Sequence, residues 1–153
     1  MTNPTKYFLL LLTVSCFHFP LPAQQNVPAQ AGVDSLQNIL LTAKEDTNKV
    51  NTLNNLAWEF RNTDEYENSV NCAKEAFILS DNINYKKGKA KSLNIIGVVY
   101  MDQGNYSEAL KNHYASLKIR EEIGDKRGMA NSYNNIGIIY DDQGNYPEAL
   151  KNH

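Results

Sequence analysis

Residues 94–113 read NIIGVVYMDQGNYSEALKNH, and residues 134–153 read NNIGIIYDDQGNYPEALKNH. Apolar positions and turn residues return after 40 positions, as Gly97 returns in Gly137 and Gly104 in Gly144. A period of this length is typical of helical solenoids, in which each unit is one supersecondary element that stacks on its neighbours. The internal repeat therefore predicts a stack of helical units.

Each repeat unit reads as two helices joined by a short turn. In the first helix of the middle unit, Leu93, Ile96, Gly97 and Tyr100 follow the i, i+3, i+4, i+7 spacing of one apolar stripe. Gly104 then stands where a helix ends in a left-handed residue, and the Asn that follows is a good N-cap for the second helix. The register predicts helix pairs at 48–61 with 65–81, 87–102 with 106–123, and 127–142 with 146–153.

A weaker copy of the unit precedes these two. Residues 53–60 align with residues 93–100, and Asp64 stands in place of the turn glycine. Asp tolerates the left-handed conformation better than most residues do, so the turn is retained. Asp34 is read as an N-cap, and an apolar face follows it. This pattern predicts a further helix that seals the N-terminal end of the stack. The expected domains are a capping helix at 34–46, repeat 1 at 47–86, repeat 2 at 87–126 and a truncated repeat 3 at 127–153.

The start of the chain has a different composition. Lys6 precedes a short apolar stretch that ends in two Pro residues and Ala23, which is the order of a secretory signal peptide. The stretch is shorter than the ~20 residues of a membrane-spanning helix. We therefore expect a signal peptide at 1–23, a flexible leader at 24–33, and export to the periplasm or cell envelope. In the alternative reading, Cys16 is the lipidated first residue of a lipoprotein.

The repeated pattern resembles the tetratricopeptide repeat (TPR). The family motif runs here as Leu93, Ile96-Gly97, Tyr100, Gly104, Tyr106 and Ala109-Leu110. The resemblance implies an all-α, right-handed solenoid of antiparallel helix pairs that binds proteins. The unit is about six residues longer than the usual 34, and in this it is similar to the extended repeats of kinesin light chain and of bacterial regulatory repeat proteins. A signal peptide before such repeats also resembles the N-terminal sensor region of exported bacterial TPR signalling proteins.

The chain shows no residue combination that indicates catalysis. Its formal net charge is −2 and neither sign forms a long run, so a nucleic-acid groove is not expected. Neither a nucleophile with its base and orienting group, nor a phosphate loop, nor a paired-Cys metal motif is visible, so we expect no enzyme, no cofactor and no metal. His113 and His153 copy a position at which the family places a packing residue. Cys72 is read as a passive helix residue.

A second stripe on the first helices is the candidate binding surface. In the family this stripe lines a concave groove that takes extended peptides, and Asn carboxamides with apolar neighbours suit backbone hydrogen bonds and side-chain pockets. The alternative is that the Asn residues recur only because the units were duplicated. The candidate groove residues are Asn51, Asn54, Trp58, Lys91, Asn94, Val98, Met101, Asn131, Asn134 and Ile138.

Two functions remain open at this point. One is an exported scaffold that binds a protein or an extended peptide segment. The other is the ligand-sensing input region of a larger signalling protein, such as a histidine kinase, cyclase or transcription regulator, whose output domain lies beyond residue 153. Membrane contact is expected only through a lipidated Cys16 or a downstream segment.

Overall fold

The computed structural model describes residues 27–152, with side chains from residue 31 onward. The expected signal peptide at 1–23 and the residues Cys16 and His153 lie outside the described residues, so these expectations stay predictions. Every regular element in the described range is an α-helix. The helices are α1 (Val27–Leu40), α2 (Thr47–Asn62), α3 (Tyr66–Asn82), α4 (Lys86–Asp102), α5 (Tyr106–Glu122), α6 (Lys126–Asp142) and α7 (Tyr146–Asn152).

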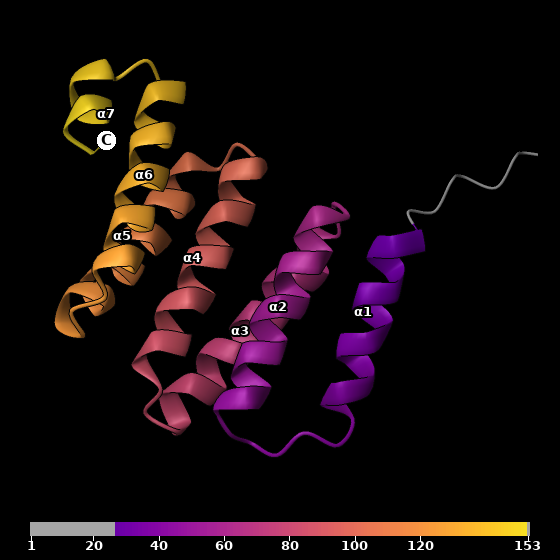
Figure 1. Ribbon diagram of the computed structural model, residues 1–153. Coiled ribbons are helices and arrows are strands. Elements are labelled where there is room, and N and C mark those ends of the chain that lie inside the picture. The colour runs from indigo at the N-terminus through magenta and orange to yellow at the C-terminus, as the bar shows by residue number, and fades with distance from the viewer. Residues whose placement is uncertain (1–26, 153) are drawn as a thin grey trace, which may run out of the picture.

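The helices form a right-handed solenoid of antiparallel pairs, which runs from α1 at one end to α7 at the other (Figure 1). Each helix packs on the next along the chain, and the first helices of successive units also touch, α2 with α4 and α4 with α6. The second helices α3 and α5, both within the described range, make no such contact. The first helices are thus gathered together while the second helices splay apart, which makes the first-helix side concave.

The predicted helix pairs and turns are confirmed. Each of the six repeat helices begins and ends within one residue of its predicted bounds, apart from the end of α7 at the edge of the described range. The turn between the helices of a unit is left-handed, with φ of 72° at Gly104 and 71° at Gly144. Asp64 adopts the same conformation, with φ of 61°. Its carboxylate accepts a hydrogen bond from the Tyr66 hydroxyl at 2.9 Å, which holds the turn without a glycine.

The expected bounds of the first helix are wrong. The sequence predicted a flexible leader to residue 33 and a capping helix at 34–46, whereas α1 begins at Val27 and ends at Leu40. Asp34 therefore lies inside the helix and is not its N-cap. Val33, which precedes the predicted start, is buried with Leu56 and Phe60 in one core cluster, so the apolar face of α1 extends upstream of the residues that the sequence pattern assigned to it. The helix stops early because the chain must turn into α2.

Asp46 caps the helix that follows this turn. Its carboxylate accepts hydrogen bonds from the backbone N–H groups of Asn48 at 2.8 Å and Lys49 at 3.1 Å. These bonds satisfy two donors that the first turn of α2 would otherwise leave without a partner. They also hold the pKa of the Asp46 carboxyl below its ordinary value. The connection at residues 41–46 is therefore fixed from the α2 side.

Small residues let the two helices of a unit approach closely. In the first unit Ala57 and Ala73 meet in the core, and both are fully buried. In the second unit the equivalent positions are Gly97 and His113, and an added Cβ at Gly97 would lie within 3.0 Å of the imidazole. The large ring of His113 is thus accommodated by the missing side chain of Gly97. The prediction that His113 packs in the core is confirmed, because it is 0% exposed.

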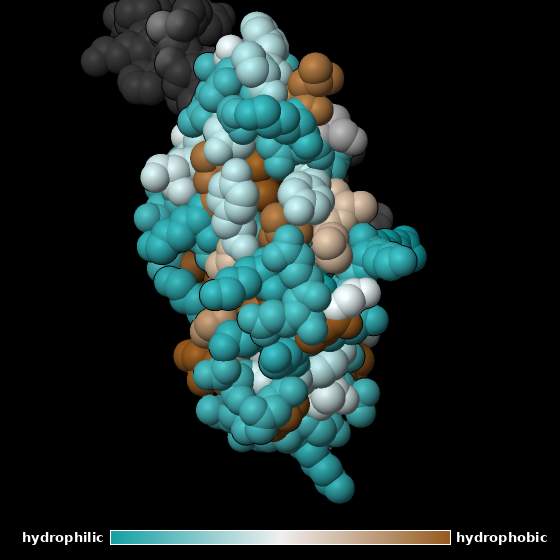
Figure 2. Space-filling view, turned by 90° about the vertical axis from the view of Figure 1, so that its left-hand side faces the viewer, coloured by the Kyte–Doolittle hydropathy of each residue, from teal (hydrophilic) through white to brown (hydrophobic). Residues whose placement is uncertain are grey.

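The end of the stack that carries α5, α6 and α7 shows hydrophobic side chains between hydrophilic ones (Figure 2). Tyr146 and Leu150 of α7 are 67% and 81% exposed. None of the described helices is both long and apolar enough to cross a membrane.

Candidate functional site

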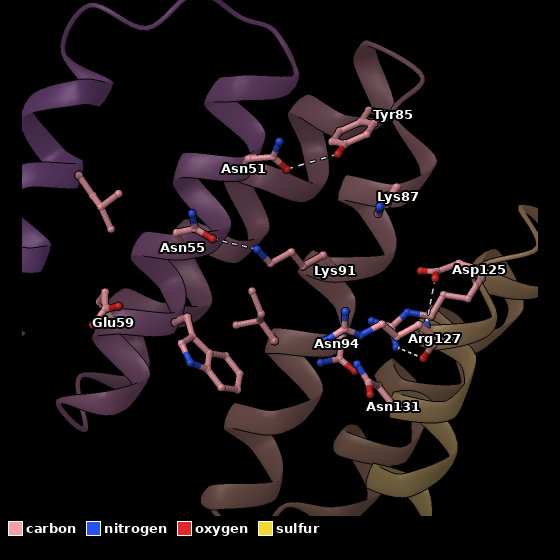
Figure 3. A pocket seen from close by; sticks show the side chains of 15 residues that line it. Asn51, Asn55, Glu59, Tyr85, Lys87, Lys91, Asn94, Asp125, Arg127 and Asn131 are labelled. Atoms are coloured by element: carbon pink, nitrogen blue, oxygen red, sulfur yellow. Dashed lines mark hydrogen bonds between the residues drawn. The ribbon is translucent and has the colours of Figure 1, made fainter.

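A groove of about 900 Å³ lies on the concave side of the stack. Side chains from α2, α4 and α6 form its floor, with contributions from α1, from the last turns of α5 and from the turns that precede α4 and α6. Figure 3 shows Asn51 and Asn55 projecting from α2, Lys91 and Asn94 from α4, and Asn131 from α6. Three successive first helices therefore present amide groups to one continuous surface.

The predicted groove residues divide into four groups. Asn51, Trp58, Lys91, Asn94 and Asn131 line the groove as expected. Asn134 lines a second hollow next to it, together with Asn131 and residues of α7. Met101 and Ile138 are half-buried and line neither hollow. The other two, Asn54 and Val98, are buried, with exposed fractions of 0% and 5%.

Asn54 is a structural residue, and its assignment to the groove is wrong. Its Nδ2 donates to the carbonyl of Gly88 at 3.4 Å, and its Oδ1 accepts from the hydroxyl of Ser92 at 2.9 Å. These bonds join α2 to the first turns of α4. Asn54 is therefore occupied at the contact between the helices, and the neighbouring Asn55 takes the exposed position instead.

The prediction that Val98 lines the groove is wrong for a different reason. Helix α4 packs against α2, α3, α5 and α6 at once, so little of its circumference remains open. A stripe of a terminal helix faces solvent, but the same stripe of a central helix is partly covered by both neighbours. The C-terminal part of α4 thus belongs to the core, and the helix reaches the groove through Lys87, Lys91, Asn94 and Ile95.

Several groove residues were missed in the sequence. Asn55 accepts a hydrogen bond from Nζ of Lys91 at 2.8 Å, and Asn51 accepts one from the hydroxyl of Tyr85 at 3.4 Å (Figure 3). The doubled Asn at 54 and 55 could have signalled that a second amide was available. The missed lining residues are Leu36, Asn55, Glu59, Tyr85, Lys87, Ile95, Arg120, Asp125, Arg127 and Gly128.

The groove carries more positive than negative charge. Four cations line it (Lys87, Lys91, Arg120 and Arg127) against two carboxylates, Glu59 and Asp125. Partial desolvation in the groove lowers the pKa of Lys91 although the residue as a whole is exposed. Burial likewise lowers the pKa of Arg120, against the opposing effect of the Asp125 charge.

The comparisons with known proteins identify the repeat. Residues 89–153 match the family model of the tetratricopeptide repeat. The second and third repeat units of the chain are therefore similar to the tetratricopeptide repeat. No curated protein matches the chain. TPRs are generally scaffolds for contacts between proteins.

Solved structures share the TPR fold at low sequence identity. The TPR domain of Arabidopsis FLU is 22% identical with a TM-score of 0.64, covering 69% of this chain and 88% of that one. BtubC from P. vanneervenii is 20% identical with a TM-score of 0.67, and the match covers 81% of this chain but 52% of BtubC. A candidate kinesin light chain of Podosopora anserina, with nearly identical TPR-like repeats, is 16% identical with a TM-score of 0.67, covering 84% of this chain and 65% of that one. At these identities the likeness concerns the fold alone.

The reactive groups of the TPR stack are placed as packing residues. His113 has no hydrogen-bond partner at either ring nitrogen within the described part of the chain. Its pKa falls to about 4 because of burial and, to a lesser degree, because of the charge of Arg120. Burial, with the charge of Glu75, raises the pKa of the Cys72 thiol to about 11, so it stays protonated at neutral pH. The described residues hold no cluster of side chains suited to a metal ion.

Proposed function

We propose that this protein binds an extended segment of a partner protein in the groove between α2, α4 and α6. The observation that carries the proposal is the row of amides Asn51, Asn94 and Asn131, which line one groove from three successive first helices. A carboxamide offers two donors and an acceptor, so each can hydrogen-bond both polar groups of a peptide unit. The row therefore suits recognition of a backbone that passes across the helices.

The proposal is tested by removing these amides. Each hydrogen bond lost from a partner should weaken binding by about 0.5–1.5 kcal/mol. The triple variant Asn51→Ala, Asn94→Ala, Asn131→Ala should then bind at least roughly tenfold more weakly. Binding can be measured by titration calorimetry against peptides selected from a random library on the parent protein.

A control variant separates binding from stability. Asn112→Ala removes an amide from α5 that bonds the carbonyl of Glu108 and does not line the groove. This variant should bind the same peptides as tightly as the parent does. If the triple variant folds and also binds like the parent, the Asn row is a remnant of duplication and the contact surface lies elsewhere.

We also propose that the protein acts after export to the cell envelope. The proposal rests on the apolar stretch between Lys6 and Ala23. The intact mass of protein recovered from the envelope fraction should lack residues 1–23, and a retained Met1 would refute it. A lipid on Cys16 would favour the lipoprotein alternative. A role as the input region of a signalling protein uses the same groove and stays a prediction.

A further inference from the structure

Arg120 is an unusual groove residue because it is a buried cation that forms no ion pair within the described residues, although the charge of the neighbouring Asp125 acts on it. Arg120 is only 6% exposed. Nη1 donates to the carbonyl of Gly128 and to the hydroxyl of Ser132, the latter at 2.9 Å. A guanidinium has five N–H donors, so three remain, and the described part of the chain supplies no partner for them. Because Arg120 lines the groove, these donors are available to a ligand there.

The position of Arg120 is a departure from the repeat. Gly128 and Ser132 lie 40 residues after Gly88 and Ser92, whose carbonyl and hydroxyl bond Asn54 in the first unit. In the second unit Arg120 has taken the place of the Asn at these two groups. Asn94, the copy of Asn54, is consequently released: it accepts a hydrogen bond only from Asn135, at 3.3 Å, and is half-exposed in the groove.

Arg120 belongs to a set of groove cations that form no ion pair with a carboxylate. Within the described residues, none of Lys87, Lys91, Arg120 and Arg127 lies within ion-pair distance of an acidic side chain, whereas six other cations do. Asp125 faces the same hollow, accepts the backbone N–H of Gly128 through Oδ1 at 3.0 Å, and partly offsets the charge of Arg120. With four cations against the carboxylates of Glu59 and Asp125, the groove lining still has a positive excess. The whole chain has a net charge of −2, so this groove has the opposite sign to the rest of the protein.

The two ends of the groove differ in chemistry. At the α1 and α2 end it is lined by Leu36, by Trp58, which is 39% exposed, and by Glu59. This end suits an apolar side chain and repels an acidic one. Arg120 and Arg127 line the α6 end and attract an acidic one. Figure 3 shows Glu59 and Arg127 on opposite sides of the hollow, with Asn94 between them.

We propose that the groove is specific for an acidic segment of a partner protein, with one or two carboxylate side chains at Arg120 and Arg127 and an apolar side chain at Trp58. This inference rests on the function proposed above. Neighbouring helices pack about 10 Å apart, so the two steps from α2 to α6 span roughly 20 Å. An extended chain rises about 3.3 Å per residue, which places the apolar residue roughly six positions from the acidic one.

The test is a selection from a random peptide library on the purified protein. Selected peptides should be enriched in Asp or Glu at one end and in a large apolar residue roughly six positions away. A synthetic copy of a selected peptide with Gln in place of each Glu should bind about tenfold more weakly, because a charge-assisted hydrogen bond to a guanidinium is replaced by a neutral one. Phosphoserine in place of Glu is a further arm, since it asks whether a phosphate is preferred.

Variants of the groove cations identify which residues recognise the acidic side chain of the peptide. Arg120→Gln should abolish the preference for Glu over Gln. Because Arg120 also bonds α6, the double variant Lys91→Gln, Arg127→Gln, at two exposed positions, makes the same test without touching a buried group. Lys118→Gln is the matched control, since it removes one positive charge from an exposed site of α5 outside the groove, and it should keep the preference.

The outcomes separate this inference from the proposed function. Peptides that bind without acidic enrichment would overturn the acidic specificity and leave the peptide-binding function standing. If the variant Lys118→Gln also loses the preference for Glu over Gln, the preference is a general effect of net charge, and its assignment to the groove is overturned. A tenfold stronger preference for phosphoserine would replace carboxylate with phosphate as the ligand. If the parent selects no peptide at all, both proposals fail.

Discussion

Gly97 is the position at which one added methyl group tests the packing of the stack most directly. A Cβ there would lie 2.8 Å from Cε1 of His113 and 2.9 Å from its Nε2. The imidazole is a rigid ring in a residue that is 0% exposed, so it cannot swing into solvent. We predict that Gly97→Ala destabilises the protein, although Ala is intrinsically the better helix former.

The size of the effect follows from two opposing contributions. Overpacking a filled core costs about 1–3 kcal/mol, and replacing Gly by Ala inside a helix returns about 0.5–1 kcal/mol. The two ranges leave a net loss of up to about 2.5 kcal/mol, with a middle value of about 1 kcal/mol, which lowers the melting temperature by several degrees. Gly32→Ala is the matched control, because a Cβ in that position of α1 would lie 3.9 Å from the nearest atom of Glu59, an ordinary contact. This control should be stabilised by up to about 1 kcal/mol.

A double variant makes the test specific to the contact. Gly97→Ala together with His113→Ala reproduces the pair Ala57 and Ala73 of the first unit. The double variant should be destabilised by about 1 kcal/mol or more less than the sum of the two single variants, because His113→Ala removes the ring that the added methyl group overlaps. Urea unfolding followed by circular dichroism measures all four proteins. A Gly97→Ala variant as stable as the parent, or costs that simply add, would refute the close packing of His113 on Gly97.

Three further predictions concern titration, hydrogen bonding and a turn. Stability should fall as the pH drops from 6.5 toward 4, because burial lowers the pKa of His113 to about 4 and the unfolded chain then binds a proton that the folded protein does not. The free energy of unfolding should change by roughly 3 kcal/mol over this range. In the variant His113→Ala the urea midpoint should depend less on pH than it does in the parent. Asn54→Ala should cost about 1–3 kcal/mol of stability because it leaves buried groups unpaired. Asn94→Ala should instead weaken peptide binding with little change in the melting curve. The reverse pattern would contradict the roles assigned to these two residues. Asp64→Gly should change stability by no more than about 1 kcal/mol, since relief of the left-handed backbone is offset by the lost bond to the Tyr66 hydroxyl; a larger loss in thermal unfolding would show that the carboxylate is the main support of that turn.

The fold could be predicted from the sequence because its signals are local and repeated. The apolar stripe of each helix, the turn at Gly104 and the copy at Gly144 fix helix bounds and connections within each unit, and stacking follows once a unit has two open faces. The capping helix was predicted, but its bounds were wrong because no local signal marks its upstream end. Its extension depends on the burial of Val33 against Leu56 and Phe60, which are contacts between segments that the repeat pattern does not relate.

The groove could be predicted only in part, and the errors have a common cause. Helical spacing assigns a residue to a face of its own helix, but it does not say which neighbour covers that face. Asn54 shares its stripe with exposed residues and is nevertheless buried, because α4 presents Gly88 and Ser92 to it. Arg120 escaped notice because it ends a second helix, where a charged residue is normally solvated. Both positions are decided by the contact between units.

The contrast between Asn54 and Asn94 shows how duplicated units can acquire separate roles without change at the duplicated residue itself. Both are the same amino acid at the same place in the motif. What differs is the residue that reaches the backbone of the following unit, which is Asn54 itself in the first case and Arg120 in the second. One change at the end of a second helix therefore does two things together: it releases an amide into the groove and brings a cation beside it. The contact between units is satisfied in both cases, because the Arg120 guanidinium donates to the Gly128 carbonyl and the Ser132 hydroxyl, which correspond to the two groups that Asn54 bonds.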